Sequence, residues 1–189
     1  MGLTKICTRL AQYFVSFKKL LRDTVGTFLL RQWKQTEKGD IVSIEESMLP
    51  EVFRIQEEGF KNGNKEKIAI YSKKMKKIFY VIMSQDKVVG YCIYYLKSAL
   101  SLKGFEKISV ICAIATDSNY RGRGFAERLL KKSIEEMKLN GISSILLYVN
   151  VHNQPAIRLY EKIGFQKTDE VNNICGQDEK CYEMKLKLI

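Results

Sequence analysis

The feature that most constrains the fold is a strand, a glycine-rich turn and a helix that follow one another without interruption. The run Lys107–Ala115 is almost continuously apolar, which predicts a strand buried on both faces. An amphipathic helix is expected from about Arg123 to Leu139, and Asn140-Gly141 ends it. The turn between them is Tyr120–Ala126, with the sequence YRGRGFA. A buried strand that leads directly into a helix indicates a sheet covered by helices.

Hydrophobic periodicity predicts the other elements of this sheet. The apolar runs Phe79–Met83 and Val88–Leu96 are separated by a turn at Gln85–Lys87 and indicate a hairpin. Further strands are expected at Ile41–Ile44, Ser144–Val149, Phe165–Thr168 and Tyr182–Leu188, and helices at Met48–Phe60, 68–77 and Pro155–Ile163, with a loop at Lys61–Lys67. Strands followed by strand–helix–strand–helix units predict a mixed α/β (α+β) fold whose sheet is mostly antiparallel.

The first 40 residues differ from the rest in their charge. They contain eight Lys and Arg against three acids, a net of +5, whereas residues 41–189 contain 24 against 18, a net of +6. Apolar residues recur every three or four positions over residues 3–30, which predicts a basic amphipathic helix. Such a helix packs on its own domain or a second subunit, lies on an anionic membrane surface, or is a removed or disordered leader. We therefore expect a helical extension at 1–40 and a folded domain at 41–189.

Composition places the chain among soluble cytoplasmic proteins. Its 189 residues suit one domain with an appendage, and no apolar run approaches the roughly 20 residues that span a bilayer. Five cysteines without a C-x-x-C pair favour reduced thiols, and together with a single histidine, His152, they offer no obvious ligand set for a metal. The formal charge of +11 suits an anionic cofactor, substrate or surface, but no interleaved aromatic and basic motif indicates specific nucleic-acid binding.

The glycines of Tyr120–Ala126 allow backbone N–H groups to crowd around an anion, and the N-terminus of the following helix adds positive potential. The segment is not a P-loop, because no Gly-Lys-Ser/Thr follows, and Glu127 occupies the third glycine position of a dinucleotide fingerprint. It is therefore a phosphate-binding loop of another kind, or a tight turn that uses its glycines for geometry alone.

A second segment, Asn153–Phe165, follows a predicted strand and has the sequence NQPAIRLYEKIGF. The two segments together resemble the GNAT superfamily of acyl-CoA-dependent N-acetyltransferases, and they are nearest to its ribosomal-protein N-terminal acetyltransferase branch. The first is similar to the family's Arg/Gln-x-x-Gly-x-Gly/Ala pyrophosphate loop, and the second to its Asn-x-x-Ala-x-x-Leu-Tyr-x-x-x-Gly-Phe segment. The detailed match covers about residues 108–165, and the element order is compatible from residue 41 onward. The resemblance implies a GNAT-like fold with acetyl-CoA as co-substrate.

The resemblance also implies a role for each matching position. The cofactor-binding positions are the main chain of Ala113, Ile114 and Ala115 for the pantetheine arm, the amides of Arg121, Gly122, Arg123, Gly124, Phe125 and Ala126 for the pyrophosphate, and Asn153 beyond the splayed strands. Tyr160 matches the position whose phenol protonates the departing thiolate. Other interpretations stay open: Tyr160 is a buried tyrosine, Asn153 starts a helix, and the arginines are surface charges.

One position departs from the family pattern and leaves the base undetermined. Five residues before Asn153, where the ribosomal-protein branch has a carboxylate, this chain has Tyr148. A phenol with an ordinary pKa of about 10 is a poor base at neutral pH. The proton is then removed by water held at Tyr148 or at strand carbonyls, by another carboxylate such as Glu106, or with little help. An α-amine, with a pKa of about 7.7–8.0, is thus favoured as acceptor over a lysine at about 10.4.

These observations predict an N-acetyltransferase in which a primary amine attacks acetyl-CoA directly, with a peptide α-amine or a small-molecule amine preferred. The alternative is a catalytically inactive basic module that retains the fold and binds a membrane surface or a protein partner. The intact Tyr160, Asn153 and glycine loop favour the enzyme.

Overall fold

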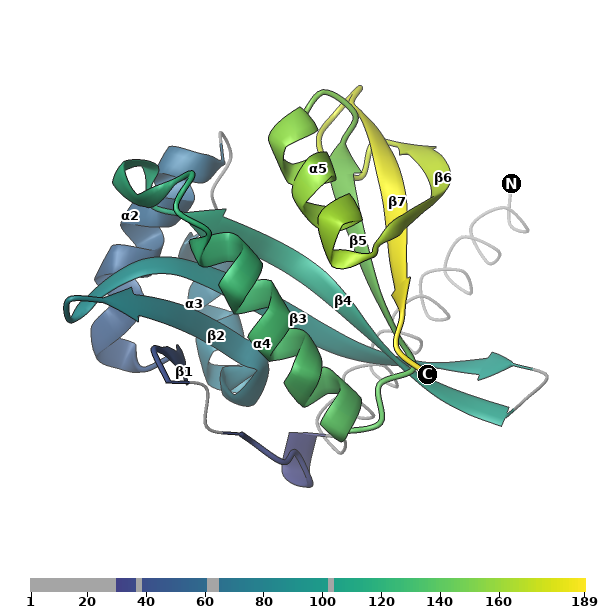
Figure 1. Cartoon of the computed structure of the whole chain (residues 1–189), viewed down its shortest axis with the longest axis horizontal. Coiled ribbons are helices and arrows are strands. Elements are labelled where there is room, and N and C mark those ends of the chain that lie inside the picture. Colours follow the sequence, from purple (N-terminus) through teal and green to yellow (C-terminus); the bar gives the residue numbers. More distant parts are fainter. Residues whose placement is uncertain (1–29, 37–38, 61–64, 102–103) are drawn as a thin grey trace, which may run out of the picture.

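The computed structural model describes residues 30–36, 39–60, 65–101 and 104–189. These residues form one seven-stranded sheet with the strand order β1-β2-β3-β4-β5-β7-β6 (Figure 1). The strands are β1 Ile41–Ser43, β2 Phe79–Ser84, β3 Lys87–Ser101, β4 Gly104–Thr116, β5 Ser144–Asn150, β6 Gln166–Asn172 and β7 Lys180–Lys187. Five of the six neighbouring pairs are antiparallel, and β4–β5 is parallel. The expectation of a mixed, mostly antiparallel sheet is confirmed.

Helices cover both faces of this sheet (Figure 1). The described helices are α2 Leu49–Gly59, α3 Lys65–Lys74, α4 Phe125–Leu139 and α5 Gln154–Ile163, with short 3-10 turns η1 Glu46–Met48, η2 Lys76–Ile78 and η3 Ser118–Tyr120. Side chains alternate along β3, so that Cys92 and Tyr94 pack in the cluster under α4 and α5. Tyr91 and Ile93 pack in the cluster under α2 and α3. The alternation of side chains along β3 therefore contributes residues to both core layers, one on each face of the sheet.

The β2–β3 hairpin confirms the expected turn, but the next hairpin is longer than predicted. Gln85 and Asp86 have φ of 50° and 59°, the left-handed pair that a two-residue type I′ turn requires. β3 and β4 continue well beyond the expected strands and pair as an arm that projects past the rest of the sheet (Figure 1). Phe105 on this arm is 82% exposed. Gly104 and Lys107 on the same strand are exposed as well, so this described part of the arm does not have the buried apolar pattern of the other strands.

A buried carboxylate fastens the segment before β1 to α4. Glu136 is fully buried, and its Oε1 accepts hydrogen bonds from Trp33 Nε1 at 2.8 Å and from the Tyr80 hydroxyl at 2.7 Å. Its Oε2 accepts a hydrogen bond from Thr36 N at 2.9 Å. Burial, reinforced by the charge of Glu136, raises the pKa of Tyr80, which keeps the phenol a neutral donor. Residues 33 and 36, within the expected 1–40 extension, thus pack on the domain.

The N-terminal helix expected over residues 3–30, with its membrane-surface or dimer contact, lies outside the described residues. Among the residues that are described, no helix has both the length and the apolar character needed to cross a bilayer.

The cysteines require a correction. Cys175 and Cys181 form a disulfide, with Cα atoms 6.2 Å apart, so the expectation of reduced thiols is wrong for this pair. The β6–β7 hairpin brings the two residues together. A spacing of six positions between two cysteines does not by itself predict a disulfide. Cys92 and Cys112 are free.

We expect Trp33→Ala to lower the free energy of unfolding by about 3–5 kcal/mol, because it leaves a cavity in the main core and removes one donor from the buried Glu136. Urea unfolding followed by circular dichroism measures the change. Lys34→Ala is the matched control, because the side chain next to Trp33 in sequence is exposed. Equal stability of the two variants would show that the segment before β1 does not belong to the core.

Candidate active site

β4 and β5 pair over a short stretch and then diverge. Their parallel register begins with Ile108 opposite Ser144 and ends with Val110 opposite Leu146. Beyond it, β4 stays paired with β3 and β5 stays paired with β7, so the strands separate while each remains in the sheet (Figure 1). From Ile111 onward, the β5-facing edge of β4 has backbone groups that pair with no described strand. Such an edge can accept an extended ligand as an additional strand.

A β-bulge in β4 lies where the strands diverge. The register with β3 skips one residue of β4, Cys112, and such a bulge bends the strand. Residues Ile108–Ile111 are buried, whereas Cys112–Thr116 are only half-buried. The expectation of a strand buried on both faces is therefore wrong for its second half, because β5 has left its side. The positions predicted to face the pantetheine arm, Ala113, Ile114 and Ala115, all lie on this half-buried part.

The glycine loop leads from the end of β4 into α4. Gly122 and Gly124 have φ of +74° and +80°, a conformation that side chains rarely adopt, and a Cβ added at either position would meet nothing within 4 Å. Gly124 is the N-cap of α4, which therefore begins at Phe125, two residues later than predicted. No side chain of the described residues caps this helix, so the amides of its first turn have no side-chain acceptor, and the space beside Gly122 and Gly124 is open. Open space lined by free amides suits an anion.

The two arginines of the loop are exposed and held against it. Arg121 Nε donates to the carbonyl oxygen of Thr116 at 3.2 Å. The guanidinium of Arg123 lies 5.3 Å from the ring centroid of Tyr120, and that ring packs edge-on against Phe125. Both positive charges consequently stay next to the free amides at the N-terminus of α4.

An ion pair beneath this loop was missed from the sequence. Asp117 is 3% exposed and accepts hydrogen bonds from the Arg54 guanidinium of α2 and from Asn119 N. Burial by itself raises the pKa of Asp117, but these hydrogen bonds outweigh it, so the pKa lies below its usual range. Arg54 also donates to Glu58, which accepts a hydrogen bond from Ser118 N at 3.3 Å. α2 thus anchors the start of the loop through residues 63 positions apart, which no local motif could reveal.

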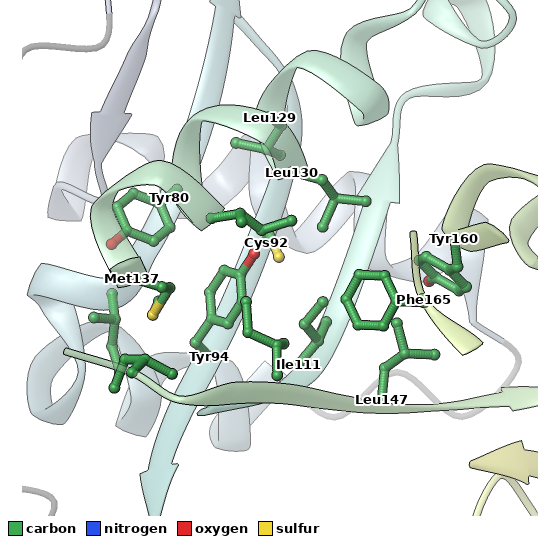
Figure 2. Packing of buried hydrophobic residues seen from close by; sticks show 14 of the residues in the cluster. Tyr80, Cys92, Tyr94, Ile111, Leu129, Leu130, Met137, Leu147, Tyr160 and Phe165 are labelled. Carbon is green, nitrogen blue, oxygen red and sulfur yellow. The ribbon is translucent and has the colours of Figure 1, made fainter. Parts of the chain in front are cut away.

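Tyr160 lies on α5, on the α4 side of the diverging strands. Its side chain is 6% exposed, and its ring packs edge-on against Phe165 with centroids 5.8 Å apart (Figure 2). Leu147 of β5 and Cys92 of β3 belong to the same core cluster. Burial raises the pKa of the Tyr160 phenol, which keeps it protonated at neutral pH. The hydroxyl makes no hydrogen bond to any described residue, so it is available to a ligand.

Tyr148 belongs to the opposite face of the sheet, because it follows Leu147 on β5. Its hydroxyl donates to Glu183 Oε2 at 2.8 Å, and Glu183 Oε1 accepts a hydrogen bond from Thr168 Oγ1 at 2.9 Å. Partial burial and then the hydrogen bond to the Glu183 carboxylate raise the pKa of Tyr148 to about 12. No local motif points to Glu183, although pairing the predicted strands 144–149 and 182–188 would have suggested it, because Tyr148 stands directly opposite Glu183.

Three other residues from the sequence analysis lie as follows. The Asn153 side chain accepts a hydrogen bond from Ala156 N at 3.3 Å and caps α5, as the helix-start interpretation required. Glu106 lies on the projecting arm, before the β4–β5 pairing, and the structure does not bring it to the divergent part of the strands. His152 is exposed in the turn before α5.

The free thiols are not activated. Burial raises the pKa of Cys112 to about 12 and also raises that of Cys92, so both side chains are neutral thiols near pH 7. A neutral buried thiol is a poor nucleophile. Among the described residues, the arrangement therefore suits direct transfer between two bound molecules rather than a covalent acyl-enzyme.

Comparison with known proteins agrees with this geometry. Residues 40–165 match the sequence profile described as the Acetyltransferase (GNAT) family. An N-alpha-acetyltransferase from Saccharolobus solfataricus is 32% identical over 111 residues, which cover 56% of this chain and 66% of that protein. The chain spans between 20 and 66% of the length of the first curated relatives that it matches.

Solved structures share the fold at lower identity. The ribosomal-protein-S18-alanine N-acetyltransferase of Escherichia coli is 22% identical with a TM-score of 0.63, covering 78% of this chain and 92% of that one. Naa50 of Arabidopsis thaliana, in complex with the bisubstrate analogue CoA-Ac-MVNAL, is 20% identical with a TM-score of 0.65, covering 78% of this chain and 97% of that one. The fold expected from the two sequence segments is confirmed.

We expect Asp117→Asn to lower the free energy of unfolding at pH 7 by about 1–3 kcal/mol, because it weakens charge-assisted hydrogen bonds at a buried position. Since the pKa of Asp117 is lowered by folding, its contribution is fully present above the ordinary carboxyl pKa of about 3.9 and is lost progressively as the pH falls from there through the lower pKa of the folded state. Urea titrations at pH 7 and pH 3 test both points. The control is Glu135→Gln, which removes an exposed ion pair with Lys132; a stability difference for Asp117→Asn that persists unchanged at pH 3 would contradict the assignment.

Proposed function

Because this chain belongs to the GNAT family of acetyltransferases, we propose that it transfers an acetyl group from acetyl-CoA to a primary amine. The observation that carries the proposal is the divergence of β4 from β5 next to an uncapped, glycine-led helix N-terminus. One feature provides an unpaired strand edge and the other provides an anion site. A long ligand with an extended arm and a pyrophosphate needs both.

The residues present fit acetyl-CoA. The amides of Arg121 to Ala126 would hold the pyrophosphate, since the two glycines leave room where side chains would intrude. The exposed guanidinium groups of Arg121 and Arg123 would neutralise its charge. The free edge at Ala113, Ile114 and Ala115 would pair with the pantetheine arm. Acetyl-CoA would supply an activated thioester, and the chain would orient it.

Tyr160 is the proposed proton donor to the leaving sulfur. It lies on the α5 side of the divergent strands, is protonated at neutral pH and has no hydrogen-bond partner among the described residues. Tyr148 lies on the other face, so the two phenols stand on opposite sides of the strands. We place the acceptor amine on the Tyr148 face. The Asn153 side chain caps α5, so Asn153 would contact the cofactor only at the N-terminus of that helix.

A peptide α-amine is the preferred acceptor. The relative from Saccharolobus solfataricus is named N-alpha-acetyltransferase, and the bisubstrate analogue in the Arabidopsis thaliana Naa50 structure is CoA-Ac-MVNAL. An α-amine is also largely neutral near pH 8, whereas a lysine amine must lose a proton from a pKa of about 10.4 before it can attack. A catalytically inactive basic binding module is the alternative, and acetyl-CoA binding without turnover of any amine would establish it.

The double variant Arg121→Ala, Arg123→Ala is expected to weaken acetyl-CoA binding at least tenfold, because two charge-assisted contacts to phosphate are lost. Isothermal titration calorimetry measures the dissociation constants. Lys132→Ala is the matched control, because Lys132 is an exposed cation of α4, the helix that follows the loop, and pairs with Glu135 at 3.1 Å. Equal affinities for the double variant and the control would place the cofactor elsewhere.

Tyr160→Phe is expected to lower kcat for an α-amine peptide about 10²-fold while changing the KM for acetyl-CoA by less than threefold, because only the proton donor is removed. Steady-state kinetics with a thiol-detecting dye measure both constants. Tyr182→Phe is the control, since it removes the hydroxyl of a tyrosine on β7, where Tyr182 pairs with Val149 of β5, and leaves α5 unchanged. A Tyr160→Phe enzyme with unchanged kcat would assign this tyrosine to packing alone.

A further inference from the structure

We propose that Glu183 receives the proton of the attacking amine, through the hydroxyl of Tyr148. This inference rests on the acetyltransferase activity proposed above and assigns the base for that reaction. It places the carboxylate that takes the proton on β7, the strand that pairs with β5.

The carboxylate of Glu183 is held in one orientation. The Tyr148 hydroxyl donates to Oε2 at 2.8 Å from β5, and Thr168 Oγ1 donates to Oε1 at 2.9 Å from β6. Each oxygen therefore has one donor from a different neighbouring strand, and each keeps further acceptor capacity. Thr168 is the residue at which the β6 register shifts, between Lys167 and Asp169, and the bulge turns its hydroxyl toward Glu183.

The pair lies where a reacting amine would lie. Tyr148 is two residues beyond Leu146, the last residue of β5 that pairs with β4, and it is on the same face as Leu146. Both Tyr148 and Glu183 are half-buried. The ring of Tyr95 on β3 lies close enough to raise the pKa of Tyr148 further. Tyr148 therefore lies on the part of β5 just beyond its pairing with β4, on the side away from Tyr160, and its hydroxyl is directed toward Glu183 of β7.

Other charged groups surround Glu183. Asp169 stands opposite it on β6, and Lys185 follows it on the same face of β7. No described cation makes an ion pair with the Glu183 carboxylate itself, since its partners are the two hydroxyls. The carboxylate oxygens therefore keep acceptor capacity that no described cation occupies.

Tyr148 cannot serve as the base alone. With a pKa of about 12, its phenolate is scarcely populated at neutral pH. A relay avoids this state, because the phenol gains one proton as it gives up another and is never charged for long. The hydrogen bond that contributes to the raised pKa of Tyr148 thus also connects its hydroxyl to a carboxylate.

The proton and electron balance of the step is as follows. The lone pair of the amine nitrogen forms the C–N bond, the C–S bond breaks, and its electron pair leaves with the sulfur, which takes the proton of Tyr160. The nitrogen loses one proton to the Tyr148 oxygen while the Tyr148 proton passes to Glu183 Oε2. Solvent then returns Glu183 and Tyr160 to their starting states, so no oxidant, reductant or metal takes part.

The test compares Glu183→Gln, Tyr148→Phe, the double variant and Glu170→Gln in the full-length chain, with a peptide that has a free α-amine. Glu170 is the matched control, because it is a carboxylate of the same three-stranded edge whose partner, Lys180, lies 3.2 Å away. kcat and KM are measured from pH 6.5 to 9.5, and acetyl-CoA affinity is measured by calorimetry for every variant.

We expect Glu183→Gln and Tyr148→Phe each to lower kcat at pH 7 about 10²-fold, with acetyl-CoA affinity within threefold of the wild type. The double variant loses little more than either single variant, because the two groups act as one unit. The loss shrinks toward pH 9.5, where hydroxide takes the nitrogen proton that the variants can no longer pass to Glu183. A merely structural pair would give a loss that does not depend on pH.

Three outcomes overturn the proposal. A Glu183→Gln enzyme within threefold of the wild type at pH 7 removes Glu183 from the reaction. A loss that is equal at all pH values, or one matched by Glu170→Gln, assigns the pair to structure. Wild-type protein that binds acetyl-CoA but acetylates no amine overturns the proposed function and this inference together, whereas the first two outcomes leave the proposed function intact.

Discussion

The three-residue length of the parallel pairing between β4 and β5 governs the rest of the structure. A longer ladder would close the sheet and bury β4 on both edges. Here β4 keeps its pairing with β3, and β5 keeps its pairing with β7, so both strands hold their core positions while their facing edges part. The unpaired backbone groups of β4 would be costly in a dry core. They are tolerated because the strand beyond Ile111 is half-buried and an extended ligand can satisfy them.

Where β4 and β5 diverge, the alternation of side chains along β5 places different chemical groups on the two faces of the sheet. Leu147 points into the core under α4 and α5, where Tyr160 lies, and its neighbour Tyr148 points to the other face. In a closed sheet, groups on these two faces could not reach the same ligand. Where the strands part, a group on each face can approach the same ligand, so an acid and a base can act on opposite ends of one reacting centre. Burial raises the pKa of both phenols, which suits donors and relays rather than anions.

Local pattern was sufficient wherever a residue's role depends on its near neighbours in sequence. The apolar strands, the two-residue turn at Gln85–Asp86 and the left-handed glycines of the loop all belong to this class. Contacts between distant segments could not be derived in this way. Glu183 contacts Tyr148 across 35 positions of the sequence, and Arg54 contacts Asp117 across 63. In the sequence, Glu183 and Arg54 both look like ordinary surface charges. The Cys175–Cys181 pairing and the projecting β3–β4 arm join residues that are near in sequence, and they were missed because neither has the hydrophobic periodicity from which the other elements were predicted.

A single carboxylate links the two helices that flank the divergent strands. Glu127 stands in the first turn of α4, where a negative charge would compete with a bound phosphate for the helix N-terminus. Its oxygens instead meet Lys131 of the same helix at 2.8 Å and Lys162 of α5 at 2.7 Å. These hydrogen bonds hold the pKa of Glu127 below its usual range and offset its charge. The third position of a dinucleotide fingerprint is therefore occupied here by a residue that joins the loop-bearing helix to the helix that carries Tyr160.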